Sequence, residues 1–326
     1  MKQDKQQELT IYDYEQKYVK RENAKGVKFA ARILAFLIYI FAFAVLFFIT
    51  KEVYQLYDVA GLIVGVICVI LYISFIIIPV CKVFKSDYFE TNVNKALAPK
   101  AIKHNRIVRR NIAKKIIDMN ERVTSIKWYD EALVGKLAIS VTNHNDKQIK
   151  NNLTLLYNDS IKATAKEMIF KSSVKSAMFS SISQQSTIDV ALVTATNIQM
   201  IKDIVFLYGF RPSDAKLAKI FSTVIMNSLV SYGLGNSNIG NAVVKSIGGA
   251  TKSIPILGSL LETIIDSSIQ GITNATFTAV IGHQTIKYLE KEYNLQNLLD
   301  EVVLSTDEDL KDTCLQVEKE LKKAKK

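Results

Sequence analysis

Proline is scarce in this chain of 326 residues, which contains four prolines, three cysteines and three histidines. Proline interrupts helices, so its scarcity leaves room for long helical segments. Hydrophobic residues recur along most of the chain with helical rather than alternating periodicity. The sequence therefore predicts an all-α protein.

The scarcity of cysteine and histidine limits the chemistry that the chain can perform. The cysteines are Cys68, Cys81 and Cys314. They form no CxxC pair and indicate neither a disulfide framework nor a zinc site. His104, His144 and His283 are equally scattered, and none has a second ligand at helical spacing. We expect no metal site and no cofactor.

Catalytic motifs are also missing. The nearest approach to a phosphate-binding loop has Ser246 and Thr251 where the P-loop needs glycine, and no predicted strand precedes it. No GxSxG nucleophile elbow occurs, and no cysteine lies near a histidine in a catalytic pattern. Glu262 and Asp266 are one helical turn apart, which is more typical of a solvated or salt-bridged helix face than of an acid–base pair. We expect a protein that is not an enzyme, with an unrecognised membrane hydrolase as the catalytic alternative.

Two long apolar runs are the most informative feature that the chain does have. Residues 33–49 and 60–80 contain no charged side chain, and the first run extends back to Phe29. About 20 apolar residues in a helix cross the roughly 30 Å core of a bilayer. We therefore predict a transmembrane hairpin over residues 29–81, with spans at about 29–49 and 60–80.

Basic residues flank the hairpin on one side. They are dense before the first run and after the second, whereas the connector carries only Lys51. The positive-inside bias therefore predicts a multi-pass membrane protein with both termini in the cytoplasm. The first run begins too far into the chain, and is too long, for a cleaved signal peptide. Gly61 and Gly65 form a GxxxG pair, which predicts close packing either within the hairpin or in a homo-oligomer.

The formal net charge of +11 raises the question of nucleic-acid binding. The basic residues concentrate directly after the second run, where anionic lipid headgroups attract each charge by about 1 kcal/mol. No aromatic-rich platform, helix-turn-helix or zinc finger accompanies the charge. We expect the basic helix after Pro99 to contact the lipid bilayer and its anionic headgroups or to pack on the following domain. We expect no nucleic-acid partner.

Composition divides the rest of the chain. The predicted parts are a polar N-terminal segment (1–28), a basic helical region (82–180), an apolar helical domain (181–293) and a charged C-terminal tail (294–326). In the tail, Ser305 and Glu308 form a capping pair that predicts the start of the last helix.

The clearest helix signals of the apolar domain begin at Asp189, three residues after a serine, a spacing that resembles a capping box. Apolar periodic positions continue to Tyr208, and Gly209 suits the left-handed conformation that ends a helix. A second apolar helix ends at Gly233, where a glycine-rich stretch begins. This second helix is apolar enough to be central in the core.

Four stretches of this domain together form a familiar pattern. They are Ile188–Leu192, Met200–Gly209, the apolar helix Leu217–Gly233, and Ile281-Gly282-His283 with Tyr288 after it. The pattern, and the layout of a polar N-terminus, two spans and a helical cytoplasmic domain, resembles the YcjF-like family of bacterial inner-membrane proteins. The resemblance covers residues 30–295. It marks five family-motif or structural positions: Asp189, Tyr208, Gly209, Gly233 and Gly282.

The resemblance implies a protein of the bacterial cytoplasmic (inner) membrane whose molecular activity is uncharacterised. Related helical domains occur joined to P-loop GTPase domains, and YcjF-like proteins tend to be encoded beside a P-loop NTPase. It thus implies a non-catalytic membrane-bound partner or effector of a P-loop NTPase, acting in envelope-stress adaptation. The residues leave an alternative open, which is membrane remodelling or pore formation. In that case residues 233–283 would insert into the bilayer, with Glu262 and Asp266 lining water.

Overall fold

The computed structural model describes residues 58–87, 98–122, 127–182, 186–212, 270–292, 295–299 and 302–324, together with single positions within 43–55 and 216–224. In this part of the chain every regular element is a helix and no strand occurs, which confirms the all-α prediction. Gly233, Glu262 and Asp266 lie outside the described residues, so their predicted roles stay predictions.

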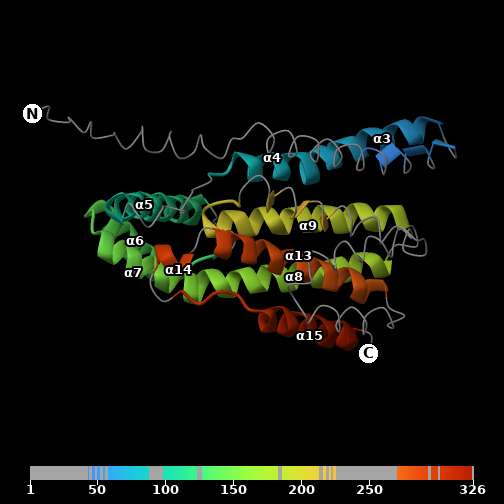
Figure 1. The fold of residues 1–326 in the computed structure, drawn as a ribbon. Helices are drawn as coiled ribbons and strands as arrows, with labels where there is room; N and C mark the ends of the chain where they lie inside the picture. The colour runs from blue at the N-terminus through green and yellow to red at the C-terminus, as the bar shows by residue number, and fades with distance from the viewer. Residues whose placement is uncertain are drawn as a thin grey trace, which may run out of the picture.

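The described helices follow one another in chain order (Figure 1). They are α3 (Asp58–Tyr72), the π-helical turn η1 (Ile73–Ile77), α4 (Ile78–Lys85), α5 (Ala98–Arg122), α6 (Glu131–Thr142), α7 (Asp146–Leu155), the π-helical turn η3 (Leu156–Ile161), α8 (Lys162–Ile182), α9 (Ser186–Tyr208), α13 (Gln270–Glu292), α14 (Leu295–Leu298) and α15 (Asp307–Ala324). The turn η1 joins α3 and α4 into one continuous helix, and η3 joins α7 and α8 in the same way.

The centre of the domain is a bundle of α8, α9 and α13, with α15 packed on its outside (Figure 1). Helix α13 contacts all three of the others, and every residue from Asn274 to His283 is buried. Gly282 is one reason for the close packing, because a Cβ atom added there would lie 2.5 Å from Cγ1 of Ile169 in α8. The absence of a side chain at Gly282 thus lets α13 approach α8 closely.

The end of α9 follows the sequence prediction. Gly209 has a φ of +76°, directly after the last helical residue, and its N–H donates to the carbonyl of Phe206 over 3.1 Å. The predicted left-handed glycine cap is therefore confirmed.

Two buried tyrosines complete this helix end from other parts of the chain. The hydroxyl of Tyr157 in η3 donates to the carbonyl oxygen of Tyr208 over 2.7 Å, and the hydroxyl of Tyr129 donates to that of Leu207 over 2.9 Å. Burial raises the pKa of Tyr157 well above its ordinary value, so the hydroxyl keeps its proton and acts as a donor. The last carbonyls of α9, which no helical N–H can reach, are thereby satisfied.

The basic helix α5 lies along α6, α7 and α9. Its apolar side, including Val108, Ile112 and Ile116, is buried in the common core. Arg109 is 6% exposed and forms an ion pair with Asp146 at 2.7 Å. Of the two placements predicted for this helix, the structure thus shows packing on the domain, and lipid contact stays a prediction for its exposed side.

Two helices of the described residues are long and apolar enough to cross a membrane, at residues 59–85 and 189–208. Only 11% of the most apolar stretch of the first is buried, whereas 61% of that of the second is buried inside the bundle. The second is therefore a core helix by its surroundings. The predicted first span, residues 29–49, lies outside the described residues except for three positions, Phe43, Leu46 and Phe47, so the hairpin stays a prediction.

The predicted glycine pair in the second span has close neighbours. A Cβ atom added at Gly61 would lie 2.5 Å from Cα of Tyr54, and one added at Gly65 would lie 3.0 Å from Cγ2 of Thr50. Both neighbours precede α3 in the chain, so the two glycines pack within the chain.

Candidate functional site

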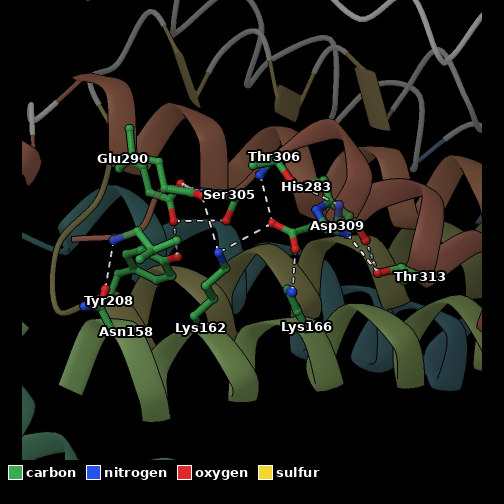
Figure 2. Close-up of polar contacts among 12 residues, drawn as sticks. Asn158, Lys162, Lys166, Tyr208, His283, Glu290, Ser305, Thr306, Asp309 and Thr313 are labelled. Atoms are coloured by element: carbon green, nitrogen blue, oxygen red, sulfur yellow. Dashed lines mark hydrogen bonds and ion pairs between the residues drawn. The ribbon is translucent and has the colours of Figure 1, made fainter. Parts of the chain in front are cut away.

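Buried and half-buried polar side chains gather where the start of α15 meets the bundle (Figure 2). They come from α8, α9, α13 and α15 and from the connection before α15, and hydrogen bonds and ion pairs join them. Buried polar groups are stable only when they are paired, so the network fixes how α15 lies on the bundle.

Glu290, near the end of α13, is the acceptor at one end of the network. Its carboxylate accepts from the Tyr208 hydroxyl at 3.1 Å, from the Ser305 N–H at 2.6 Å and from the Ser305 hydroxyl at 3.1 Å. Burial raises the pKa of Glu290, and the three hydrogen bonds offset only part of that rise. Tyr208, a residue marked by the family resemblance, thus joins α9 to α13.

Asp309, in the first turn of α15, is the acceptor at the centre of the network. It lies 2.5 Å from Nζ of Lys166 and 3.6 Å from Nζ of Lys162, both in α8. It also accepts from the N–H of Thr306 at 2.8 Å. Burial alone would raise the pKa of Asp309, but these hydrogen bonds and lysine charges outweigh it and lower the pKa to about 2.

His283 in α13 forms the other end of the network. The Thr313 hydroxyl donates to the carbonyl of Asp309 at 2.8 Å, so its oxygen accepts from Nε2–H of His283 at 3.0 Å. We therefore assign the tautomer with the proton on Nε2. Burial lowers the pKa of His283 to about 4, so the ring is neutral at neutral pH. Its buried Nδ1 has no hydrogen-bond partner in the described part of the chain.

The helix start in this region differs from the prediction by one residue. The predicted capping pair was Ser305 with Glu308, but Thr306 and Asp309 bond to each other across the first turn, and α15 begins at Asp307. The prediction was wrong because Ser305 is bonded to Glu290 instead. Asp307 adds an ion pair to Lys287 of α13.

The two ends of the network are buried, whereas the side chain of Lys166 at its centre is 39% exposed. Glu290 is 5% exposed and His283 is 2% exposed. Among the described residues, no three His, Cys, Asp or Glu side chains lie close enough to hold a metal ion. The network can hold α15 on the bundle of α8, α9 and α13. The strength of this attachment depends on the charges of the acids in α15 and of the lysines in α8 and α13.

The predicted positions contribute unequally to this site. Tyr208 belongs to the network, Gly282 precedes His283 in the tightest packing of α13, and Gly209 ends the helix that presents Tyr208. Asp189 is buried in the first turn of α9. The glycines Gly61 and Gly65 belong to α3 and lie outside the site.

Sequence reasoning missed Glu290, Asp309 and the two lysines of α8. One signal was available, because Glu290 follows His283 by seven residues and so lies on the same face of a helix. An acid at an otherwise apolar helix position indicates a buried partner. No such signal exists for Lys166, since its partner is 143 residues away in the sequence.

Comparison with known proteins gives one match. A family model described as a domain of unknown function (DUF697) matches residues 144–307, about half of the chain. Neither the curated proteins nor the solved structures contain a significant match to the chain. The matched range begins just before α7 and ends at Asp307, the first residue of α15. It therefore extends beyond the domain predicted at residues 181–293 and includes α8, which packs against α9 and α13.

Proposed function

The chain belongs to the DUF697 family, and on that premise we propose that it is a membrane-anchored, non-catalytic protein whose helical domain binds a protein partner. Within that family we propose membership of the YcjF-like group of the bacterial inner membrane, with both termini in the cytoplasm. The partner proposed from that resemblance is a P-loop NTPase, and the setting is envelope-stress adaptation.

The observation that carries the membrane anchor is an exposed apolar belt on the helix formed by α3, η1 and α4. The exposed residues of the belt are Val59, Leu62, Ile63, Val66, Ile67, Val69, Ile70, Leu71, Ile73, Phe75 and Ile78. Twenty helical residues, from Val59 to Ile78, extend roughly 30 Å, which equals the thickness of a bilayer core. Burial by lipid explains why such a belt is left uncovered by protein.

The end of this helix supports a domain held close to the membrane surface. After the belt, Val80 and Val83 are buried, and Phe84 stacks on Phe221 with ring centroids 5.9 Å apart. Arg211 donates to the carbonyl of Ser86 at 3.0 Å, and Lys115 of α5 pairs with Asp87 at 2.8 Å. The helix is therefore fixed to the domain at several points.

Basic side chains near this attachment favour contact with anionic headgroups. Lys82 and Lys85 follow the belt, and Lys103, Arg106 and Lys114 lie on the exposed side of α5. Each such charge near an anionic leaflet adds about 1 kcal/mol of attraction. The bilayer is thus the first partner proposed, and the protein partner is the second.

The test is crosslinking of the full-length protein in its native membrane, followed by mass spectrometry of the captured proteins. We expect a P-loop NTPase, captured through lysines of the helical domain and absent from membranes that lack the protein. Capture of nothing but lipid and further copies of the chain would contradict the partner-binding function.

The alternative of membrane remodelling rests on the glycine-rich and apolar segment 233–283, of which residues 233–269 lie outside the described residues. Against it, the end of this segment belongs to α13, where every residue from Asn274 to His283 is buried in the bundle. Cysteine labelling at Leu260 and Ile264 separates the two functions. Protection that depends on lipid would favour remodelling, and protection that depends only on folding would favour partner binding.

A further inference from the structure

We propose that the face of α8 and α13 that α15 covers, called the groove below, is the docking site for an acidic amphipathic helix of the partner protein, and that α15 occupies this groove until the partner displaces it. The proposal deepens the proposed function and rests on it for the existence of a protein partner. The groove is inside the range that defines the family, whereas α15 extends beyond it.

The apolar attachment of α15 is small. Its buried side chains are Leu310, Thr313, Cys314 and Val317. Val317 does not join the main core but packs in a separate small cluster with Ala177 and Ala275. Leu310 and Cys314 join the main core, and the partly buried Leu321 packs against the small cluster. The apolar contact of α15 is thus confined to one narrow face of the helix, which limits the free energy that holds it.

Charge supplies the rest of the attachment. Lys162 and Lys166 of α8 and Lys287 of α13 face the first turn of α15, where they pair with Asp307 and Asp309. With α15 removed, Lys166 and Lys287 would lose the acids that they pair with, and Lys162 would keep only the carboxyl group of Glu290 in α13 nearby. A helix with acids in its first turn is the complementary occupant, because it restores the pairs without burying a lone charge.

The groove also sets the apolar pattern of the occupant. In α15, the acid Asp309 comes immediately before Leu310, and Cys314 and Val317 follow on the same face. This spacing of i, i+4 and i+7 is typical of the apolar residues by which an amphipathic helix binds in a groove. The other face of α15 is exposed and carries charges such as Lys311, Asp312 and Lys319, so the released helix remains soluble.

The first test is hydrogen exchange of the full-length protein in detergent, read by mass spectrometry. We expect the amides of α15 to exchange at least 10-fold faster than those of α8 and α13, because α15 opens alone. Asp309→Asn removes the charge at the centre of the network. It should accelerate the amide exchange of α15 a further 10-fold and leave the exchange rate of α13 unchanged. The matched control is Glu318→Gln, which removes only the exposed pair of Glu318 with Lys322 within α15. Equal protection of α15 and α13, or no effect of Asp309→Asn, would overturn the proposal.

The second test uses a labelled peptide of residues 307–324 as the probe. We expect fluorescence anisotropy to show binding to the full-length Asp309→Asn variant at least 10-fold tighter than to the unaltered protein, in which α15 fills the groove. The peptide carrying Asp309→Lys should lose this binding. Failure of the peptide to bind the variant would overturn the groove, as would a dimer of the variant, because a second copy would then be the occupant. Both results are independent of whether crosslinking captures an NTPase, so failures of the two proposals can be told apart.

Discussion

The two sides of α13 differ in what holds them. Toward α8, the backbone at Gly282 touches Ile169, and the Thr278 hydroxyl donates to Ser176 in a buried contact at 2.9 Å. Toward α15, Ala275 packs with Val317 in a small apolar cluster, and the polar contacts include the pair of His283 with Thr313 and the ion pair of Lys287 with Asp307. Close apolar packing cannot be replaced by water without loss, whereas charged contacts can be re-formed with another partner. One helix thus serves a permanent interface and an exchangeable one.

The largest effect is expected on the permanent side. Gly282→Val would place its β-carbon 2.5 Å from Cγ1 of Ile169 and its methyl groups against the same helix, so we expect a loss of about 3 kcal/mol in the free energy of unfolding. Urea denaturation of the full-length protein in detergent, followed by circular dichroism, measures this. Ile169→Ala in the same chain should recover part of the loss. An unchanged midpoint would show that α13 and α8 do not pack closely.

The next effect tests the contact between α13 and α15 through the protonation of His283. The pKa of His283 is about 4 in the fold and 6.5 as an ordinary value, so the unfolded chain takes up its proton first. This part of the stability is present above pH 6.5 and is lost as the pH falls toward 4. Between pH 7.5 and pH 5 the loss amounts to about 2 kcal/mol.

Two acids of the network do not contribute to this loss of stability between pH 7.5 and pH 5. The lowered pKa of Asp309 moves its contribution below pH 3.8, and the raised pKa of Glu290 makes that residue favour the fold at lower pH. The matched variant His283→Gln should therefore show a flatter dependence of the unfolding free energy between pH 7.5 and pH 5. Equal slopes for the two proteins would mean that His283 is not buried as a neutral ring.

A smaller effect is expected at Gly209, which ends α9 directly after Tyr208, the residue that joins α9 to α13. Gly209→Val forces a β-branched residue into a φ of +76° and should cost about 1 kcal/mol or more of unfolding free energy. Gly209→Asn should cost less, because asparagine tolerates this conformation better. Thermal unfolding of both variants gives the comparison, and an unchanged melting temperature for the valine variant would contradict the cap.

The smallest effect belongs to a glycine on neither interface. Gly135 lies in the exposed part of α6, and a Cβ atom added there meets nothing within 4 Å. Gly135→Ala should therefore stabilise the protein by about 0.5 kcal/mol, because alanine is the better helix former. The same denaturation experiment measures it. Destabilisation instead would mean that a neighbouring group covers this face.

Signals within a short stretch of sequence predicted the fold class and the end of α9. They failed where contacts between residues far apart in the sequence determine the structure. Gly209 is predictable because the left-handed cap depends on its own backbone. The start of α15 is not, since the bond between Ser305 and Glu290 decides which residue caps the helix. Arg109 reaches the carbonyl of Leu298 across 189 residues of sequence, and no periodicity encodes such a pair. The candidate site consists mostly of contacts of this second kind.

The π-helical turn η3 has a consequence for the length of the chain. Tyr157 lies in η3, and a π-turn contains one residue more than the α-helix requires. Removing this additional residue would straighten the helix and rotate α7 by about 100° relative to α8. The hydroxyl of Tyr157 would then turn away from the end of α9, and the arginine pair at Asp146 would separate from α5. A single deletion here would disrupt two distant contacts at once, so the number of residues in this turn is constrained as strictly as their identity.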